Sequence, residues 1–146
     1  SISQTNDIIS MKDVDMYGRV PVFYEMIFSI YNPYVDIAGF QFNLEPKDLF
    51  SISKENIYGG AAEDSGFNIY VGKGKNDQVT ILGFSMQGNV ILSSLEPQIL
   101  FSIKADIRDV QKYIDGEIIL DNLVIASKAG KTLSSKFIPY KFEDIE

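Results

Sequence analysis

Hydrophobic and polar residues alternate along much of this chain with a period of two, which is the pattern of half-buried β-strands. The clearest run is IAGFQFNL, residues 37–44, which follows an Asn-Pro turn and ends at Glu-Pro. The alternation assigns one set of side chains in this run to a core: Ala38, Phe40, Phe42 and Leu44. The other set is assigned to the opposite face: Gly39, Gln41 and Asn43. We therefore expect a strand with one buried side and one polar side.

Similar runs recur at intervals near ten residues, and no long amphipathic helix interrupts them. We expect strands over residues 8–11, 20–31, 37–44, 48–53, 67–71, 79–86, 99–107, 117–126 and 136–142. Glycine-rich residues 56–66 are expected to make at most one short helical turn, in a connection from one sheet to the other. About nine short strands with this spacing predict an all-β fold, an antiparallel two-sheet β-sandwich with jelly-roll topology.

Four of the predicted strands have distinctive features. Residues 20–31 form the longest one, and both of its faces are apolar enough that we expect a loop, a terminus or a partner to cover the second face. The alternation in residues 117–126 loses phase at Asp121-Asn122, which predicts a β-bulge. Pro139 restricts the last strand to a sheet edge or a strand end. In residues 99–107 the inward set is expected to be Ile99, Phe101, Ile103, Ala105 and Ile107.

Length and composition support one globular domain that needs no disulfide or structural metal. The chain has 146 residues, and we assign residues 1–146 to one domain with its core over about residues 8–142. Cysteine and histidine are both absent, which removes thiol nucleophiles, Ser-His-Asp triads and His- or Cys-ligated zinc. The net charge is −7, so a phosphate-binding surface is not expected. The first residue is Ser1 rather than Met, which indicates a processed product or a segment of a longer protein.

Two groups of acidic residues are candidates for chemical sites. Asp13 and Asp15 would share a face of an extended segment and could supply half of a calcium site, but a solvated loop is the simpler interpretation. A second group lies in or beside a predicted surface loop: Asp106, Asp109, Asp115 and Glu117. Paired carboxylates hydrolyse glycosides when burial raises one pKa, whereas solvated loop carboxylates keep ordinary values. We therefore expect no catalytic residue, metal or cofactor.

Four fragments in order resemble the cohesin-like family of β-sandwich modules. They are IAGFQFNL, YGGAAEDSGFNIYV, VTILGFSMQGNVI and EIILDNLVIASKAGKTL, which together lie within residues 8–133. The resemblance implies a nine-stranded jelly-roll sandwich with a non-catalytic role. Cohesins proper bind dockerin modules through one sheet face, and related modules occur in surface, adhesion and virus particle proteins. The AGFQF variety of the first fragment resembles those stand-alone modules more than a cellulosome scaffold repeat.

The resemblance implies where a partner would bind. The corresponding positions are the outward residues of the AGFQF and LGFS strands: Gln41, Asn43, Ser85 and Gln87. Uncharged amides and hydroxyls bond a partner without the desolvation penalty of charges. We therefore predict a structural module of an extracellular, cell-surface or virion assembly that docks protein neighbours, a dockerin-like partner among them, without membrane insertion or nucleic-acid binding.

A carbohydrate-binding adhesion module is the alternative, because jelly rolls bind glycans by stacking sugars on exposed aromatic rings. The candidate rings are Tyr17, Tyr31, Tyr34, Tyr58 and Tyr70.

Overall fold

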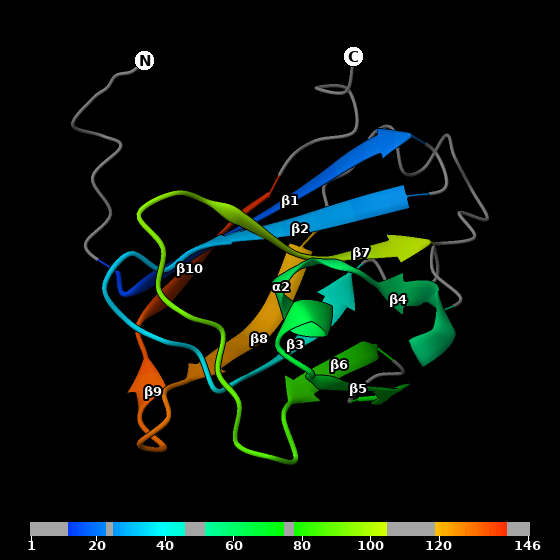
Figure 1. Cartoon of the computed structure of the whole chain (residues 1–146). Coiled ribbons are helices and arrows are strands. Elements are labelled where there is room, and N and C mark those ends of the chain that lie inside the picture. The colour runs from blue at the N-terminus through cyan, green and yellow to red at the C-terminus, as the bar shows by residue number, and fades with distance from the viewer. Residues whose placement is uncertain (1–11, 23–24, 46–51, 75–77, 105–118, 140–146) are drawn as a thin grey trace, which may run out of the picture.

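The computed structural model describes residues 12–22, 25–45, 52–74, 78–104 and 119–139. These residues form two five-stranded sheets packed face to face, so the predicted two-sheet sandwich is confirmed (Figure 1). No helix among the described residues is long and apolar enough to cross a membrane.

The first sheet has the strand order β10-β1-β2-β7-β4. Its strands are β1 (Val14–Val22), β2 (Glu25–Tyr31), β7 (Gln98–Lys104), β4 (Ile57–Tyr58) and β10 (Ser135–Pro139). β10 runs parallel to β1, and the other neighbours are antiparallel. Pro139 lies at the end of an edge strand, as predicted, which is a position where sheets tolerate proline.

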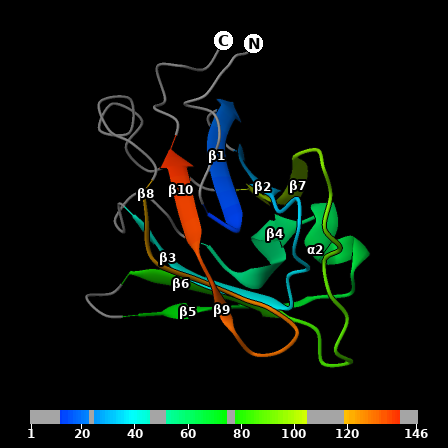
Figure 2. The same cartoon turned by 90° about the vertical axis from the view of Figure 1, so that its left-hand side faces the viewer.

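The second sheet has the order β5-β6-β3-β8-β9, and all of its neighbours are antiparallel. Its strands are β3 (Gly39–Glu45), β5 (Asn68–Lys73), β6 (Val79–Phe84), β8 (Ile119–Ala126) and β9 (Thr132–Leu133). β9 passes into β10 through Ser134, so the chain crosses between the sheets at this side of the sandwich (Figure 2). Ser134 and Asp13 exchange two hydrogen bonds there, of 2.8 and 3.1 Å.

The glycine-rich connection crosses between the sheets, as predicted. A 3-10 turn, η2 (Lys54–Asn56), leads into β4, and a five-residue helix, α2 (Gly60–Asp64), then leads to β5 in the other sheet. Gly60 has a φ of +69°, and a Cβ there would lie 2.5 Å from the carbonyl oxygen of Leu100. Only glycine fits this close approach of the helix to β7.

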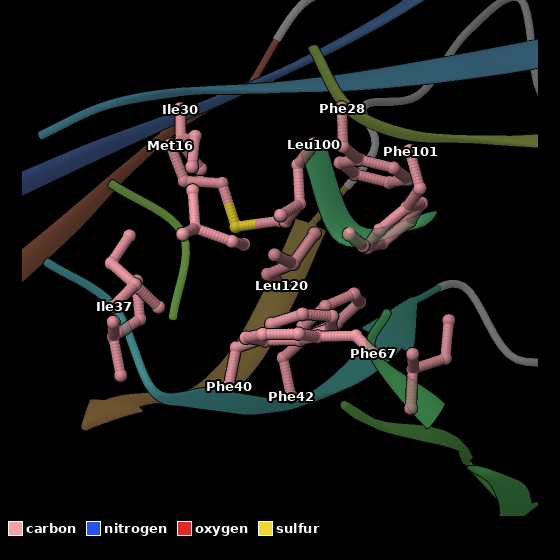
Figure 3. Packing of buried hydrophobic residues seen from close by; sticks show 14 of the residues in the cluster. Met16, Phe28, Ile30, Ile37, Phe40, Phe42, Phe67, Leu100, Phe101 and Leu120 are labelled. Carbon is pink, nitrogen blue, oxygen red and sulfur yellow. The ribbon is translucent and has the colours of Figure 1, made fainter. Parts of the chain in front are cut away.

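Aromatic side chains from both sheets fill the space between the layers (Figure 3). Phe28 of β2 lies 5.9 Å from Phe42 of β3 and 5.3 Å from Phe101 of β7, measured between ring centroids. All three side chains are at most 1% exposed. Phe40 and Leu44 are buried beside them, which confirms three of the four inward residues predicted for this run. Ala38, the fourth, precedes β3 and is half-buried.

The prediction of one long strand over residues 20–31 is wrong. The described residues show two antiparallel strands there, because β1 ends at Val22, β2 begins at Glu25, and these two residues pair. The intervening dipeptide carries no glycine, proline or asparagine, so the sequence gives no turn signal. Met26, Phe28 and Ile30 still face the core, as the period of two predicts.

The inward residues predicted for β7 are partly wrong as well. Ile99 is 46% exposed, whereas its neighbour Leu100 is 1% exposed. The register between β2 and β7 shifts between Phe28 and Ser29, so two consecutive residues of β7, Leu100 and Phe101, are buried. Phe101 and Ile103 lie in the core as predicted.

The bulge predicted in β8 is confirmed. The register between β3 and β8 shifts between Gln41, which pairs with Val124, and Asn43, which pairs with Asp121. Asn122, the next residue after Asp121, has a φ of +54°. Asparagine tolerates this left-handed conformation better than most residues. The predicted strand over residues 8–11, most of the one over 48–53, and Ala105 and Ile107 lie outside the described residues.

Candidate functional site

The outer surface of the second sheet carries two uncharged rows of side chains that run across its strands. One row crosses β5, β6, β3 and β8 and consists of Tyr70, Leu82, Gln41 and Val124. The next row crosses all five strands and consists of Asn68, Phe84, Gly39, Ala126 and Thr132. We call these nine residues the outer face. None of them is charged, although 23% of the whole chain is.

Apolar groups on the outer face are accessible to a partner. Tyr70 is 45% exposed and Val124 is 43% exposed. The rings of Tyr70 and Phe84 stack with centroids 5.5 Å apart and an angle of 21° between their planes. Uncharged centres with exposed aromatic side chains are typical of protein interfaces. The outer face is therefore a candidate docking surface.

Gln41 lies at the centre of this surface. Its side chain is exposed, and β3 places it between Leu82 of β6 and Val124 of β8. The amide therefore stands between two apolar neighbours, where it offers both a donor and an acceptor to an approaching protein.

Asn43 lies on the same strand but is only 8% exposed. Its Nδ2 donates to Oε1 of Gln78 at 3.1 Å, and its Oδ1 accepts from the Thr80 hydroxyl at 2.7 Å. A Cβ on Gly74 would collide with the Thr80 hydroxyl and lie 3.2 Å from Oδ1 of Asn43, so the Gly74 backbone lies close over this pair. The amide is committed to contacts inside the domain, and Asn43 does not share the accessible surface of Gln41.

Ser85 and Gln87 lie past the end of β6, in the turn that leads away from the outer face. Ser85 is 8% exposed, and its hydroxyl accepts the backbone N–H of Gln87 at 3.1 Å. Gln87 is exposed. The four predicted partner-binding residues are therefore separated. Gln41 is central and accessible, whereas Asn43 and Ser85 are buried. Gln87 is accessible but lies beyond the end of β6.

The first sheet also has apolar residues on its outer side. Ile27, Ser29 and Tyr31 of β2 are half-buried, and Ile27 and Ser29 line a hollow together with Tyr17 and Arg19 of β1. The hydroxyl of Tyr58 donates to a carboxylate oxygen of Glu25 at the other end of this surface. Unlike the outer face of the second sheet, this side therefore combines its apolar residues with charged ones.

The acidic residues considered as chemical sites do not form one within the described part of the chain. The Asp13 carboxylate accepts the backbone N–H of Ser134, and Asp15 is only 4% exposed on β1. Among described residues, no three acidic side chains approach one another closely enough to hold a metal ion. The loop carboxylates Asp106, Asp109, Asp115 and Glu117 lie outside the described residues.

The exposed tyrosines are spread over the molecule. Tyr34 is 88% exposed on the loop after β2, Tyr58 is 43% exposed on β4, and Tyr70 lies on β5. Tyr17 and Tyr31 are half-buried in the first sheet. Tyr70 stacks on Phe84 at the outer surface of the second sheet.

Leu82 and Val124 were not predicted as site residues. Both belong to strands in which apolar residues occupy consecutive positions, VTILGF and ILDNLVIA. Apolar side chains on both faces of a strand indicate that the second face is also covered or used. The consecutive apolar residues in these two strands are therefore a sequence signal that could have identified Leu82 and Val124.

No known protein family and no curated protein matches this chain by sequence. Solved structures of cohesin modules do match its fold. A structure of a type I cohesin–dockerin complex from Clostridium thermocellum has a TM-score of 0.54 and 11% identity, over 90% of this chain and 94% of the other. A non-cellulosomal cohesin from Archaeoglobus fulgidus also has a TM-score of 0.54, with 11% identity over 87% of each chain.

A third similar structure is a cohesin module from a Clostridium perfringens family 33 glycoside hydrolase, with a TM-score of 0.54 and 13% identity over 89% of this chain and 95% of the other. The chain thus has a cohesin-like fold, as its sequence motifs predict.

Proposed function

We propose that this protein is a non-catalytic docking module that binds a protein partner through the outer face of its second sheet. The observation that carries the proposal is the uncharged row of Tyr70, Leu82, Gln41 and Val124, in which half-buried and exposed apolar side chains lie on both sides of one accessible amide. A solvated sheet face of an acidic protein would be expected to carry charges at these positions.

The fold and the side-chain chemistry support this proposal. Some of the structures that share the fold are cohesins in complex with dockerin, in which a module of this architecture binds another protein. The chain has no cysteine or histidine, which removes thiol nucleophiles and imidazole acid–base groups. We propose a surface or virion assembly as the setting, with a dockerin-like module as one possible class of partner.

Affinity capture tests the docking function. The full chain is immobilised and exposed to an extract of the particles or cell envelopes that contain it, and the retained proteins are identified by mass spectrometry. We expect one or a few proteins to be retained by the wild type and lost with Val124→Asp, which places a charge in the apolar row without touching the core. Retention of the same proteins by both forms would place the contact elsewhere.

A second candidate function rests on the stacked pair of Tyr70 and Phe84, because two nearly parallel aromatic rings offer a surface on which a sugar ring could lie. In this case the module would act in adhesion by binding a glycan. A glycan array would show specific binding that Tyr70→Ala abolishes and Tyr34→Ala leaves unchanged. An array without hits would remove this candidate and leave the protein-docking function in place.

A further inference from the structure

The exposed edges of the two sheets are unequally protected against pairing with another strand. The edge strands are β10 and β4 in the first sheet and β5 and β9 in the second. β4 and β9 have two residues each, and β10 carries Lys136 and Pro139. Short strands, lysines and prolines are the features that keep sheet edges from pairing. β5 has six residues, no proline, and a lysine only at its last position.

β5 is also regular enough to accept another strand. Its register with β6 runs without a shift from Asn68 opposite Phe84 to Lys73 opposite Val79, so no bulge twists this edge away. Within the described part of the chain β6 is its only paired neighbour, and β5 lies at the lower margin of the sandwich in Figure 1. Ile69 and Val71, on its inner face, are only partly buried.

The hairpin between β5 and β6 shows which backbone groups of β5 point outward. The N–H of Gly74 donates to the carbonyl oxygen of Gln78 at 2.7 Å. Hydrogen-bonded pairs alternate along an antiparallel ladder, so Gly72, Tyr70 and Asn68 are directed toward β6. The N–H and C=O groups of Ile69 and Val71 are then directed away from the sheet. Both residues thus offer their backbone groups and part of their apolar side chains at the same edge.

We propose that β5 is a self-association edge, at which β5 strands of two copies pair antiparallel about a two-fold axis at Tyr70. In this register Ile69 lies opposite Val71 of the second copy, and the two residues exchange backbone hydrogen bonds on each side of the axis. Tyr70 lies opposite Tyr70 of the second copy, and Asn68 lies opposite Gly72. The result is one continuous sheet made from the second sheets of both copies.

The second copy is the favoured occupant because the edge is complementary to itself. The register pairs apolar with apolar side chains on the inner face, and Lys73 lies beyond the paired residues, so no like charges are brought opposite each other. Lys54 and Glu55 line a cavity beside the edge, and their charges balance. Hydrogen bonding by the Ser53 side chain lowers the pKa of Glu55.

Two properties of such a dimer follow from the chain. The contact is confined to one short strand, well under the roughly 1,200 Å² of a standard interface, so the dimer is weak and depends on concentration. Each copy has a net charge of −7, so added salt strengthens the dimer by screening their repulsion. Because Tyr70 also belongs to the outer face, pairing would place the outer faces of both copies side by side. The pairing of the β5 edges does not depend on a partner binding to the outer face.

Sedimentation equilibrium of the full chain tests the proposal, with total concentrations from about 1 µM to about 1 mM. Tyr70→Lys and Tyr70→Glu each bring like charges together at the two-fold axis. We expect each variant alone to dissociate at least about 10-fold more readily than the wild type, and an equimolar mixture of the two to recover a dimer. Val124→Lys is the matched control, because it introduces the same charge on the same face away from the edge.

Several results would overturn the edge pairing. A wild type that stays monomeric over the whole concentration range contradicts it. A dimer weakened by Val124→Lys but not by Tyr70→Lys would show pairing between outer faces instead. Failure of the mixed variants to associate would reject the two-fold register, provided that circular dichroism shows each variant to be folded.

Discussion

The side chain of Phe40 on β3 determines which residue the neighbouring strand β6 can carry at position 83. Its ring, 3% exposed, lies over Gly83 of β6, and a Cβ at Gly83 would collide with the ring. The ring cannot easily move, because Phe67 stacks on it at 6.0 Å and Phe42 at 6.2 Å. The glycine in VTILGF is therefore required by the aromatic residue of the neighbouring strand rather than by a turn.

Gly83→Ala is accordingly expected to lower the free energy of unfolding by about 1–3 kcal/mol through overpacking. Gly72→Ala on β5 is the matched control, because a Cβ there meets nothing within 4 Å. Urea denaturation measures both variants. Equal stability of the two alanine variants would contradict the packing described for Phe40.

Removing the ring itself has a larger effect. Phe40→Ala is expected to destabilise the domain by about 3–5 kcal/mol, because it leaves a cavity beside Phe42, Phe67 and Phe101. Thermal denaturation followed by circular dichroism would show this loss, and a change below about 1 kcal/mol would mean that the core collapses around the gap.

The sequence predicts buried residues better than it predicts accessible ones. Phe40, Phe42 and Leu44 follow from the period of two, since each must avoid water. Asn43 lies on the predicted outer side of β3, but the residues that cover it, Gly74 and Gln78, are more than thirty positions away in the sequence. Local alternation carries no information about such a contact, so the burial of Asn43 could not be predicted.

At the scale of elements, bulges could be predicted only where a polar residue interrupts the pattern. Asp121-Asn122 breaks the alternation of β8, and the bulge is found there. In β7 the register shift coincides with three consecutive apolar residues, Ile99 to Phe101, so the sequence does not indicate which two face inward. The turn between β1 and β2 was missed for a similar reason, because apolar residues continue through it.

The β8 bulge supplies a prediction about backbone conformation. Asn122 has a φ of +54°, which a β-branched side chain adopts only with strain. Asn122→Val is expected to destabilise the domain by about 1–2 kcal/mol, whereas Asn122→Gly is expected to leave its stability unchanged or slightly higher. Chemical denaturation of the two variants distinguishes them, and equal stability would argue against the left-handed conformation.

Two loops at one end of the sandwich are joined by a buried amide. Asn32 is 0% exposed; its Nδ2 donates to the carbonyl oxygens of Val35 and Leu92, and its Oδ1 accepts from Gln98. Asn32→Ala removes these three hydrogen bonds, after which only the Leu92 and Gln98 groups keep a bond to each other, and it is expected to destabilise the domain by about 1–3 kcal/mol. Asn89→Ala is the control, since Asn89 is exposed and its side chain donates one hydrogen bond, to Ser65. Hydrogen exchange at Ile37 and Ile91, whose backbones pair between these loops, would rise only in the Asn32 variant.

At the scale of the whole molecule, the sandwich and its cohesin-like architecture followed from strand spacing and from four ordered motifs. The sequence did not predict which strands lie next to each other, because the order β5-β6-β3-β8-β9 depends on contacts between distant segments. The docking surface arises from this order: it brings Tyr70, Leu82 and Val124 from three separate strands around Gln41. Only Gln41 of the central row was predicted as a partner-binding residue.

The binding affinity of a Gln41 variant tests the docking function most directly. The partner obtained by affinity capture is titrated against the wild type, Gln41→Arg and Ser93→Arg, the last being a control that adds the same side chain at an exposed loop position off both sheets. Gln41→Arg is expected to bind at least about 10-fold more weakly, because it buries a charge in an uncharged interface, and its thermal stability is expected to equal that of the wild type. Unchanged affinity of Gln41→Arg would contradict docking through the outer face.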